Sequence, residues 1–191
     1  MKLENTFDVP ASPDDAWKLL IDVPRIIPCM PGATLTETID EDTWKALMSV
    51  KLGPISLSFD TEVRQEHLDE SAREARLSAS AREKRGRGAA QAVIESRLAP
   101  FDGGTRIEIT TDLALSGPVA QYGRGLIEDV STQLVQSFAD CLKAQLVAEP
   151  EAARAAVAAQ DRPVRLGRHG LAALWHAVLR LVRRDRERSN V

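Results

Sequence analysis

Residues 117–146 have the sequence GPVAQYGRGLIEDVSTQLVQSFADCLKAQL, and this stretch decides the fold. It opens with the turn-forming pair Gly117-Pro118, after which apolar side chains recur at helical spacing to about Leu146. These side chains form one stripe, which consists of Val119, Gly123, Leu126, Ile127, Val130, Leu134, Phe138 and Cys141. A single apolar stripe predicts a long helix that packs one face against the rest of the chain.

The segment before this helix predicts a run of β-strands. Apolar and polar residues alternate in it, and turn signals such as Gly53-Pro54 and Asp102-Gly103-Gly104 separate the alternating runs. In chain order, the expected strands are residues 44–51, 55–64, about 72–82, about 89–99 and about 106–113. Short connections between them favour an antiparallel sheet.

The N-terminal part adds one strand and two short helices. Residues 2–9 alternate, and Ser12-Pro13-Asp14-Asp15 then provides an N-cap, a proline in the first turn and a capping-box acid for a helix to about Ile21. A second short helix is expected over 23–27. The predicted class is α+β with a helix-grip fold. In residues 1–146, a curved antiparallel sheet of about seven strands wraps a long C-terminal helix, and the two short helices follow the first strand.

Sites for catalysis or for metal binding are not expected. His67 is the single histidine outside the C-terminal tail, and there is no HExxH, CxxC or GxSxG motif. No apolar run approaches the roughly 20 residues of a spanning helix, and the first residues do not resemble a signal peptide. We therefore expect a cytoplasmic protein in which Cys29 and Cys141 are separate buried thiols, since a reducing compartment disfavours a disulfide.

Small side chains occupy many of the positions expected to face the helix. They are Ala46, Thr61, Ala90, Ala92, Ser96 and Thr111. A wrapped sheet with small inward side chains leaves volume inside, and an apolar volume of that kind usually holds an apolar ligand. The alternative is a tightly packed core of small residues.

Three short segments carry a family resemblance. Cys29-Met30-Pro31-Gly32-Ala33, Lys51-Leu52-Gly53-Pro54-Ile55 and Tyr122-Gly123-Arg124-Gly125-Leu126-Ile127 resemble CoxG, a family of carbon monoxide dehydrogenase subunits in the START/Bet v 1-like (SRPBCC) superfamily. The resemblance covers about residues 1–146. It implies a hydrophobic pocket and an association with molybdenum-containing dehydrogenases, which such proteins are thought to link to the membrane or its quinone pool. It implies no set of catalytic residues.

Two hypotheses for function follow from the cavity and the resemblance. The first is a carrier that binds a membrane quinone, menaquinone or ubiquinone, for a molybdenum-hydroxylase-type dehydrogenase. Its expected ligand contacts are Trp44, Met48, Phe59, Ile94, Tyr122, Leu126 and Val130. The second is a recruitment or assembly factor that tethers the dehydrogenase without a ligand. An enzyme of the same superfamily is disfavoured by the lack of acid–base residues.

The C-terminal end differs from the body in charge and texture. Residues 147–165 are expected to be an Ala- and Pro-containing linker. Eight arginines give residues 162–188 a charge of +6, which leaves −9 on residues 1–161 and favours no nucleic-acid partner. A helix over 166–184 would gather Leu171, Leu174, Trp175, Val178 and Leu181 opposite Arg180 and Arg183. This amphipathic pattern in the tail, residues 166–191, predicts peripheral association with the cytoplasmic face of the inner membrane. A groove on the body and a protein partner are the alternatives.

Overall fold

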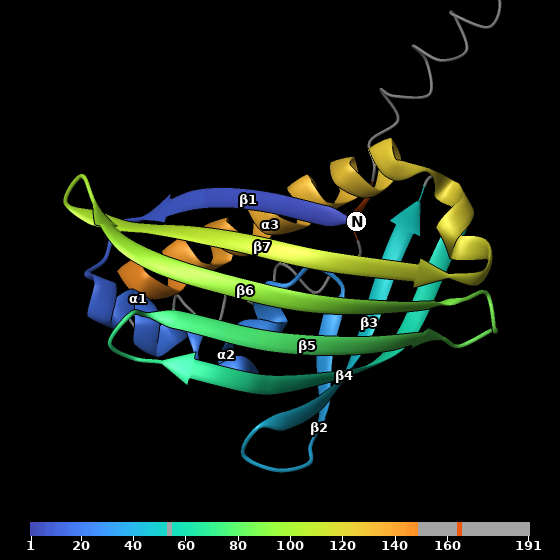
Figure 1. Cartoon of the computed structure of the whole chain (residues 1–191), viewed down its shortest axis with the longest axis horizontal. Helices are drawn as coiled ribbons and strands as arrows, with labels where there is room; N and C mark the ends of the chain where they lie inside the picture. The colour runs from blue at the N-terminus through green and yellow to red at the C-terminus, as the bar shows by residue number, and fades with distance from the viewer. Residues whose placement is uncertain (53–54, 149–163, 166–191) are drawn as a thin grey trace, which may run out of the picture.

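A curved antiparallel sheet wraps around one long helix in the computed structural model, which describes residues 1–52, 55–148 and 164–165 (Figure 1). The elements in chain order are β1 (Lys2–Val9), α1 (Pro13–Leu20), α2 (Val23–Ile26), the 3-10 helix η1 (Ile27–Cys29), β2 (Ala33–Thr38), β3 (Thr43–Leu52), β4 (Ile55–Asp69), β5 (Glu74–Glu83), β6 (Ala89–Phe101), β7 (Gly104–Ser116), the 3-10 helix η2 (Gly117–Tyr122), α3 (Arg124–Val147) and β8 (Val164–Arg165). The helix-grip prediction is confirmed.

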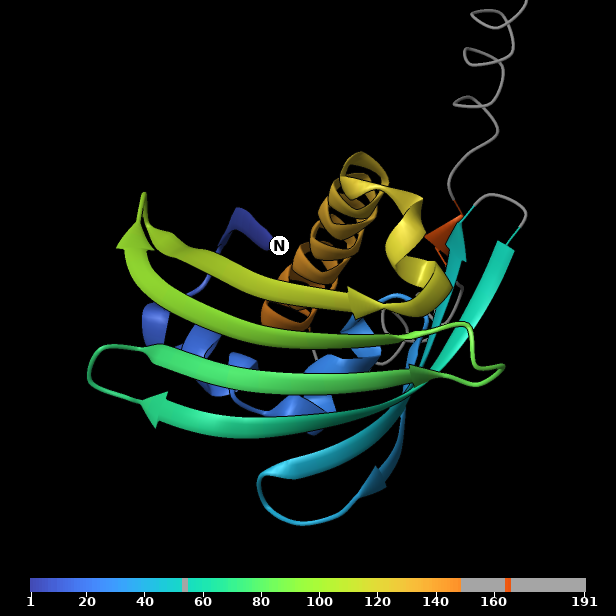
Figure 2. The same cartoon turned by 45° about the vertical axis from the view of Figure 1, so that its right-hand side comes forward.

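The sheet runs in the order β1-β7-β6-β5-β4-β3-β2, and every neighbouring pair in it is antiparallel. It curves so that α3 lies across its concave face, with α1 and α2 near one end (Figure 2). Successive side chains of a strand point to opposite faces. Strands β3 to β7 therefore present alternate residues to α3, and these residues form the wall of the interior.

Helix α1 begins where the capping residues predict it. The Ser12 hydroxyl oxygen accepts a hydrogen bond from the Asp15 backbone N–H at 3.2 Å and donates one to the Asp15 carboxylate at 2.7 Å. Pro13 occupies the first turn, where its missing N–H costs nothing. The buried side of α1, which includes Trp17 and Leu20, then closes one end of the curved sheet.

The long helix starts later than the sequence predicts. Residues 117–122 form the 3-10 helix η2, and α3 begins only at Arg124. The cause is Gly123, whose φ of +78° and ψ of 152° lie outside the helical region and separate the two helices. The prediction of one continuous helix from Gly117 is therefore wrong over residues 117–123. Its end at about Leu146 agrees with the observed last residue, Val147.

Cys29 and Cys141 form a disulfide, so the prediction of two separate thiols is wrong. The bond joins η1 to α3 across 112 residues of sequence, a proximity that the fold creates and spacing does not reveal. Gln145, which is buried beside it, donates from Nε2 to the Cys29 sulfur at 2.9 Å and accepts from Arg25 Nε at 2.9 Å. These contacts attach the α2–η1 segment to the C-terminal half of α3.

Two strands differ from the sequence prediction, which does not include them. In β2 most residues are exposed, so it lacks the apolar alternation that marks the other strands. The other is β8, which lies inside the expected linker and pairs in parallel with Val50 and Lys51 of β3. The remainder of that linker up to residue 163 and the tail, residues 166–191, lie outside the described residues. In the part of the chain that is described, no helix is long and apolar enough to cross a membrane.

Candidate functional site: an apolar cavity beneath α3

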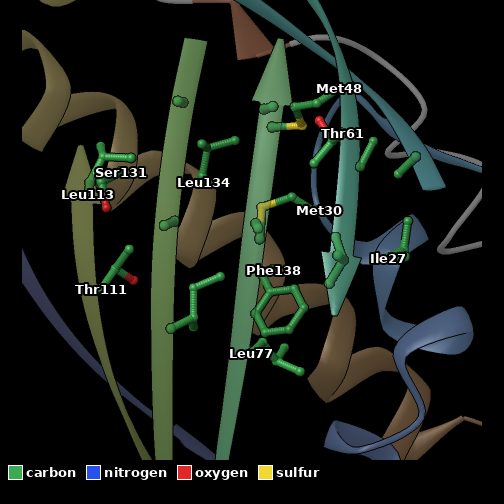
Figure 3. A pocket seen from close by; sticks show the side chains of 18 of the residues that line it. Ile27, Met30, Met48, Thr61, Leu77, Thr111, Leu113, Ser131, Leu134 and Phe138 are labelled. Carbon is green, nitrogen blue, oxygen red and sulfur yellow. The ribbon is translucent and has the colours of Figure 1, made fainter. Parts of the chain in front are cut away.

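A cavity of about 450 Å³ lies between the concave face of the sheet and α3 (Figure 3). Its volume is in the range of ordinary small-molecule sites, about 300–1,000 Å³. Of the described residues, those that line it include no Asp, Glu, Lys, Arg or His. The cavity therefore suits an uncharged, largely apolar ligand.

Alanines create most of this space. On the inward face of β5 and β6, Ala79 pairs with Ala92 and Ala81 pairs with Ala90, so four methyl groups form a compact patch on the floor of the cavity. Larger residues at these positions would reach toward α3 and fill the interior. The six small residues expected from the sequence to face inward all line the cavity, which confirms that prediction.

Larger apolar residues close the other sides. Helix α3 contributes Ile127, Val130, Leu134 and Phe138. The Phe138 ring also packs edge-on against Phe7 of β1, with 6.3 Å between the ring centroids. This contact belongs to the main core cluster, which holds the C-terminal half of α3 on the sheet. The wall formed by α3 is thereby anchored at one end.

The opposite end of the cavity is held by the β5–β6 turn. Glu83 is buried and accepts hydrogen bonds from the backbone N–H groups of Arg85 and Arg87 and from the Arg87 guanidinium at 3.0 Å. The Arg87 guanidinium also donates to the backbone carbonyl of Ser56, and the Arg87 carbonyl accepts from Val119 N–H. The guanidinium and the two N–H groups lower the pKa of Glu83 to about 2. The charged pair thus connects β5, β4 and η2 beside the cavity.

The expected ligand contacts divide into three groups. Met48, Phe59, Ile94 and Val130 line the cavity. Trp44 is buried in a separate cluster with Val23, Ile27 and Ala46, and Leu126 packs against the cluster of Leu57, Phe59, Val119 and Val130. The side chain of Tyr122 and the seven expected membrane contacts, Leu171, Leu174, Trp175, Val178, Arg180, Leu181 and Arg183, lie outside the described residues.

Polar side chains are few among the described residues of the cavity wall. They are Thr61, Gln65, Ser96, Thr111 and Ser131. Sequence alternation identifies three of them as inward-facing but not Gln65, since a polar residue after Val63 resembles the end of the apolar run. Gln65 nevertheless continues the inward face of β4, and the irregularity in pairing comes just after it, between Gln65 and His67. His67 itself is exposed.

Comparison with known families bears on this site directly. The family model for CoxG, described as a subunit of carbon monoxide dehydrogenase, matches residues 6–147, which include every cavity-lining residue of β4 to β7 and of α3. The chain belongs to the CoxG family. No curated protein sequence matches the chain.

Solved structures share the fold of this CoxG-family chain. A conserved protein from Geobacillus kaustophilus has a TM-score of 0.68 at 19% identity, over 76% of this chain and 95% of that one. A START superfamily protein from Mycobacterium smegmatis has a TM-score of 0.53 at 12% identity, over 76% and 96%. Truncated norcoclaurine synthase from Thalictrum flavum has a TM-score of 0.53 at 13% identity, over 78% and 94%. At these identities the likeness shows the START-like helix-grip fold alone.

The family and the fold together describe a domain that binds hydrophobic ligands. The described residues contain no group of three or more His, Cys, Asp or Glu that could hold a metal ion. The chemistry that the cavity offers is solvation of an apolar molecule, with a small number of hydrogen bonds to place its polar end.

Proposed function

We propose that this protein binds a long-chain quinone, menaquinone or ubiquinone, in the cavity beneath α3 and links a molybdenum-containing, carbon monoxide dehydrogenase-type enzyme to the membrane quinone pool. The protein supplies solvation and no catalysis. The dehydrogenase reduces the ring, and the isoprenoid chain stays out of water while the ligand is carried.

The observation that carries this proposal is the uncharged wall of the cavity together with its volume of about 450 Å³. Each square ångström of apolar ligand surface removed from water contributes about 25 cal/mol, so a ring and the first isoprenoid units gain several kcal/mol on entry. A charge on the ligand would be buried without a partner among the described wall residues. A neutral quinone meets both conditions.

The partner enzyme is proposed from the family. Membership of the CoxG family supports a dehydrogenase of the carbon monoxide dehydrogenase kind. The acidic body and the basic segment of residues 162–188 support two different contacts, one with the enzyme and one with anionic lipid.

A second candidate function is a tether that recruits the dehydrogenase to the membrane without a ligand. The observation that favours it is the concentration of eight arginines in residues 162–188, which would attract an anionic surface whatever the cavity holds. In this case the cavity would serve no cargo.

Organic extraction and mass spectrometry of the protein purified from cells that express the dehydrogenase separate the two functions. The carrier predicts an isoprenoid quinone at close to one molecule per chain. Protein that is empty of lipid yet co-purifies with a large molybdenum enzyme would support the tether and overturn the carrier. Protein with neither would overturn both.

A further inference from the structure

Two polar atoms on the cavity wall lack partners. Thr61 Oγ1 and Gln65 Oε1 are buried, and neither has a hydrogen bond to another described residue. Buried polar groups in proteins are nearly always paired, because an unpaired one loses its bonds to water. Two such atoms on one strand of an otherwise apolar cavity therefore call for an explanation.

The positions of the two residues suggest one. They are four residues apart on β4 and face the same side, which places their backbones about 13 Å apart. Val63 lies between them on that face and also lines the cavity. Small neighbours leave room around this stretch, because Thr61 pairs with Ala46 and Ala81, and Val63 pairs with Ala79.

The third unpaired atom differs from these two. Arg87 Nε belongs to the ion pair with Glu83 at the β5–β6 turn and is not part of the cavity wall. Its guanidinium already donates to Glu83 and to the Ser56 carbonyl. Figure 3 shows Thr61 beside Met48, on the other side of the view from Thr111 and Leu113. Among the described residues, only Thr61 and Gln65 combine burial, the lack of a partner and access to the cavity.

We infer that Thr61 and Gln65 bind the polar head group of the cavity ligand, which lies across Val63, and that they select a head group bearing a hydroxyl. This inference rests on the proposed function, since it assigns the polar end of the same ligand. A threonine hydroxyl can donate or accept, whereas the Gln65 oxygen can only accept. The ligand therefore supplies a donor at Gln65 and either kind of group at Thr61.

A consequence concerns the two redox forms of a quinone. The oxidised ring carries carbonyl oxygens, which only accept hydrogen bonds, and the hydroquinone carries two O–H donors. Only the reduced form can pair with Gln65 Oε1. The cavity should therefore hold the hydroquinone about tenfold more tightly than the quinone, as one missing hydrogen bond in a buried site implies.

The test is anaerobic calorimetric titration of the full chain with decyl-substituted benzoquinone and with its hydroquinone. Gln65→Leu should lower affinity for the hydroquinone about tenfold and leave affinity for the quinone unchanged. Thr61→Val should weaken both forms several-fold, and Thr61→Ser should restore them. Thr111→Val is the matched control, because Thr111 lines the cavity but is not among the unpaired buried groups.

Thermal unfolding of the ligand-free variants provides a second readout. Replacing an unpaired buried oxygen by a methyl group removes its desolvation cost, so Thr61→Val and Gln65→Leu should melt at the wild-type temperature or above it. A lower melting temperature for both variants would mean that the oxygens are paired within the protein, which overturns the inference. Equal binding of both redox forms by wild type and all variants would also overturn it, while the carrier function stands. Failure of wild type to bind either form overturns the carrier itself.

Discussion

Gly32 lies where two backbone segments approach too closely for a side chain. Its φ is +80°, and a Cβ placed there would collide with the backbone oxygen of Ser49 on β3. The Gly32 carbonyl accepts from Ser49 N–H at 2.8 Å, so the approach is itself a hydrogen bond. With Cys29 in the disulfide, the segment Cys29–Ala33 attaches the short helices to both the sheet and α3.

Gly32→Ala should destabilise the fold by about 3 kcal/mol, since both the left-handed backbone and the collision oppose it. Gly103→Ala is the control for backbone strain alone. Gly103 has a φ of +77° but open space around the position of a Cβ, so its replacement should cost about 1 kcal/mol. Thermal denaturation measures both. Equal losses in the two variants would show that the contact with Ser49 is not restrictive.

Glu83 makes stability depend on pH in a definite window. Its pKa in the folded protein is about 2, below the ordinary value of 4.5, so the carboxylate stabilises the fold fully above pH 4.5. That contribution is lost as the pH falls from 4.5 toward 2. The difference in melting temperature between wild type and Glu83→Gln should be constant above about pH 5 and shrink as the pH falls further. Glu70→Gln, at an exposed turn, is the control, and a difference that does not change with pH would contradict the account.

At the level of single residues, sequence reasoning succeeds where the determinant is local. Ser12 and Pro13 specify the start of α1 through contacts within three residues. The inward direction of Thr61 follows from strand alternation alone. It fails for the pairing of Cys29 with Cys141 and for the lack of partners at Gln65, because both depend on segments that only the folded chain brings together.

At the level of elements, β5 and β6 set the depth of the cavity. Ala92→Trp places a large ring on the alanine patch, between Ala79 and Leu113, where free volume exists. We expect it to abolish uptake of an apolar dye such as Nile red with a loss of stability below about 1 kcal/mol, since overpacking a full core would cost about 1–3 kcal/mol.

Ala99→Trp is the control on the same strand. Ala99 is exposed on the opposite face of β6, so this variant should take up the dye as wild type does. A collapse in melting temperature for Ala92→Trp alone would indicate a packed interior. Dye uptake unaffected in both variants would place the binding surface elsewhere.

Predictability of the elements follows the strength of the apolar pattern. Strands β1, β3, β4 and β7 alternate clearly because one face of each is buried, and the sequence predicts all four. It does not predict β2, whose residues are mostly exposed. The boundary between η2 and α3 depends on the backbone angles of Gly123, and an apolar stripe continues across it, so periodicity cannot locate it.

For the whole molecule, the central question is how the body and the basic tail divide the work. Strand β8 pairs with β3 at the end of the expected linker, so deletion of residues 166–191 keeps this pairing. That deletion should leave the melting temperature unchanged. It should also abolish binding to vesicles with anionic lipid, because each basic residue near such a surface contributes about 1 kcal/mol.

Two point variants refine the vesicle experiment. Trp175→Ala should weaken binding of the full chain without changing its salt dependence. Arg180→Glu with Arg183→Glu should reduce the salt dependence, because charge attraction is screened as ionic strength rises. A full chain that does not bind anionic vesicles at low salt, together with a truncated chain that melts earlier, would contradict the membrane hypothesis and favour a tail that packs on the body.

The most direct test of the central claim, that the cavity beneath α3 binds a quinone, is a crystal structure of the full chain soaked with a benzoquinone whose alkyl chain ends in bromine. The account predicts ring density and an anomalous bromine peak between α3 and the alanines of β5 and β6. A quinone found only on the outer face of the sheet, or a cavity closed by Leu134 and Phe138 packed onto those alanines, would contradict it.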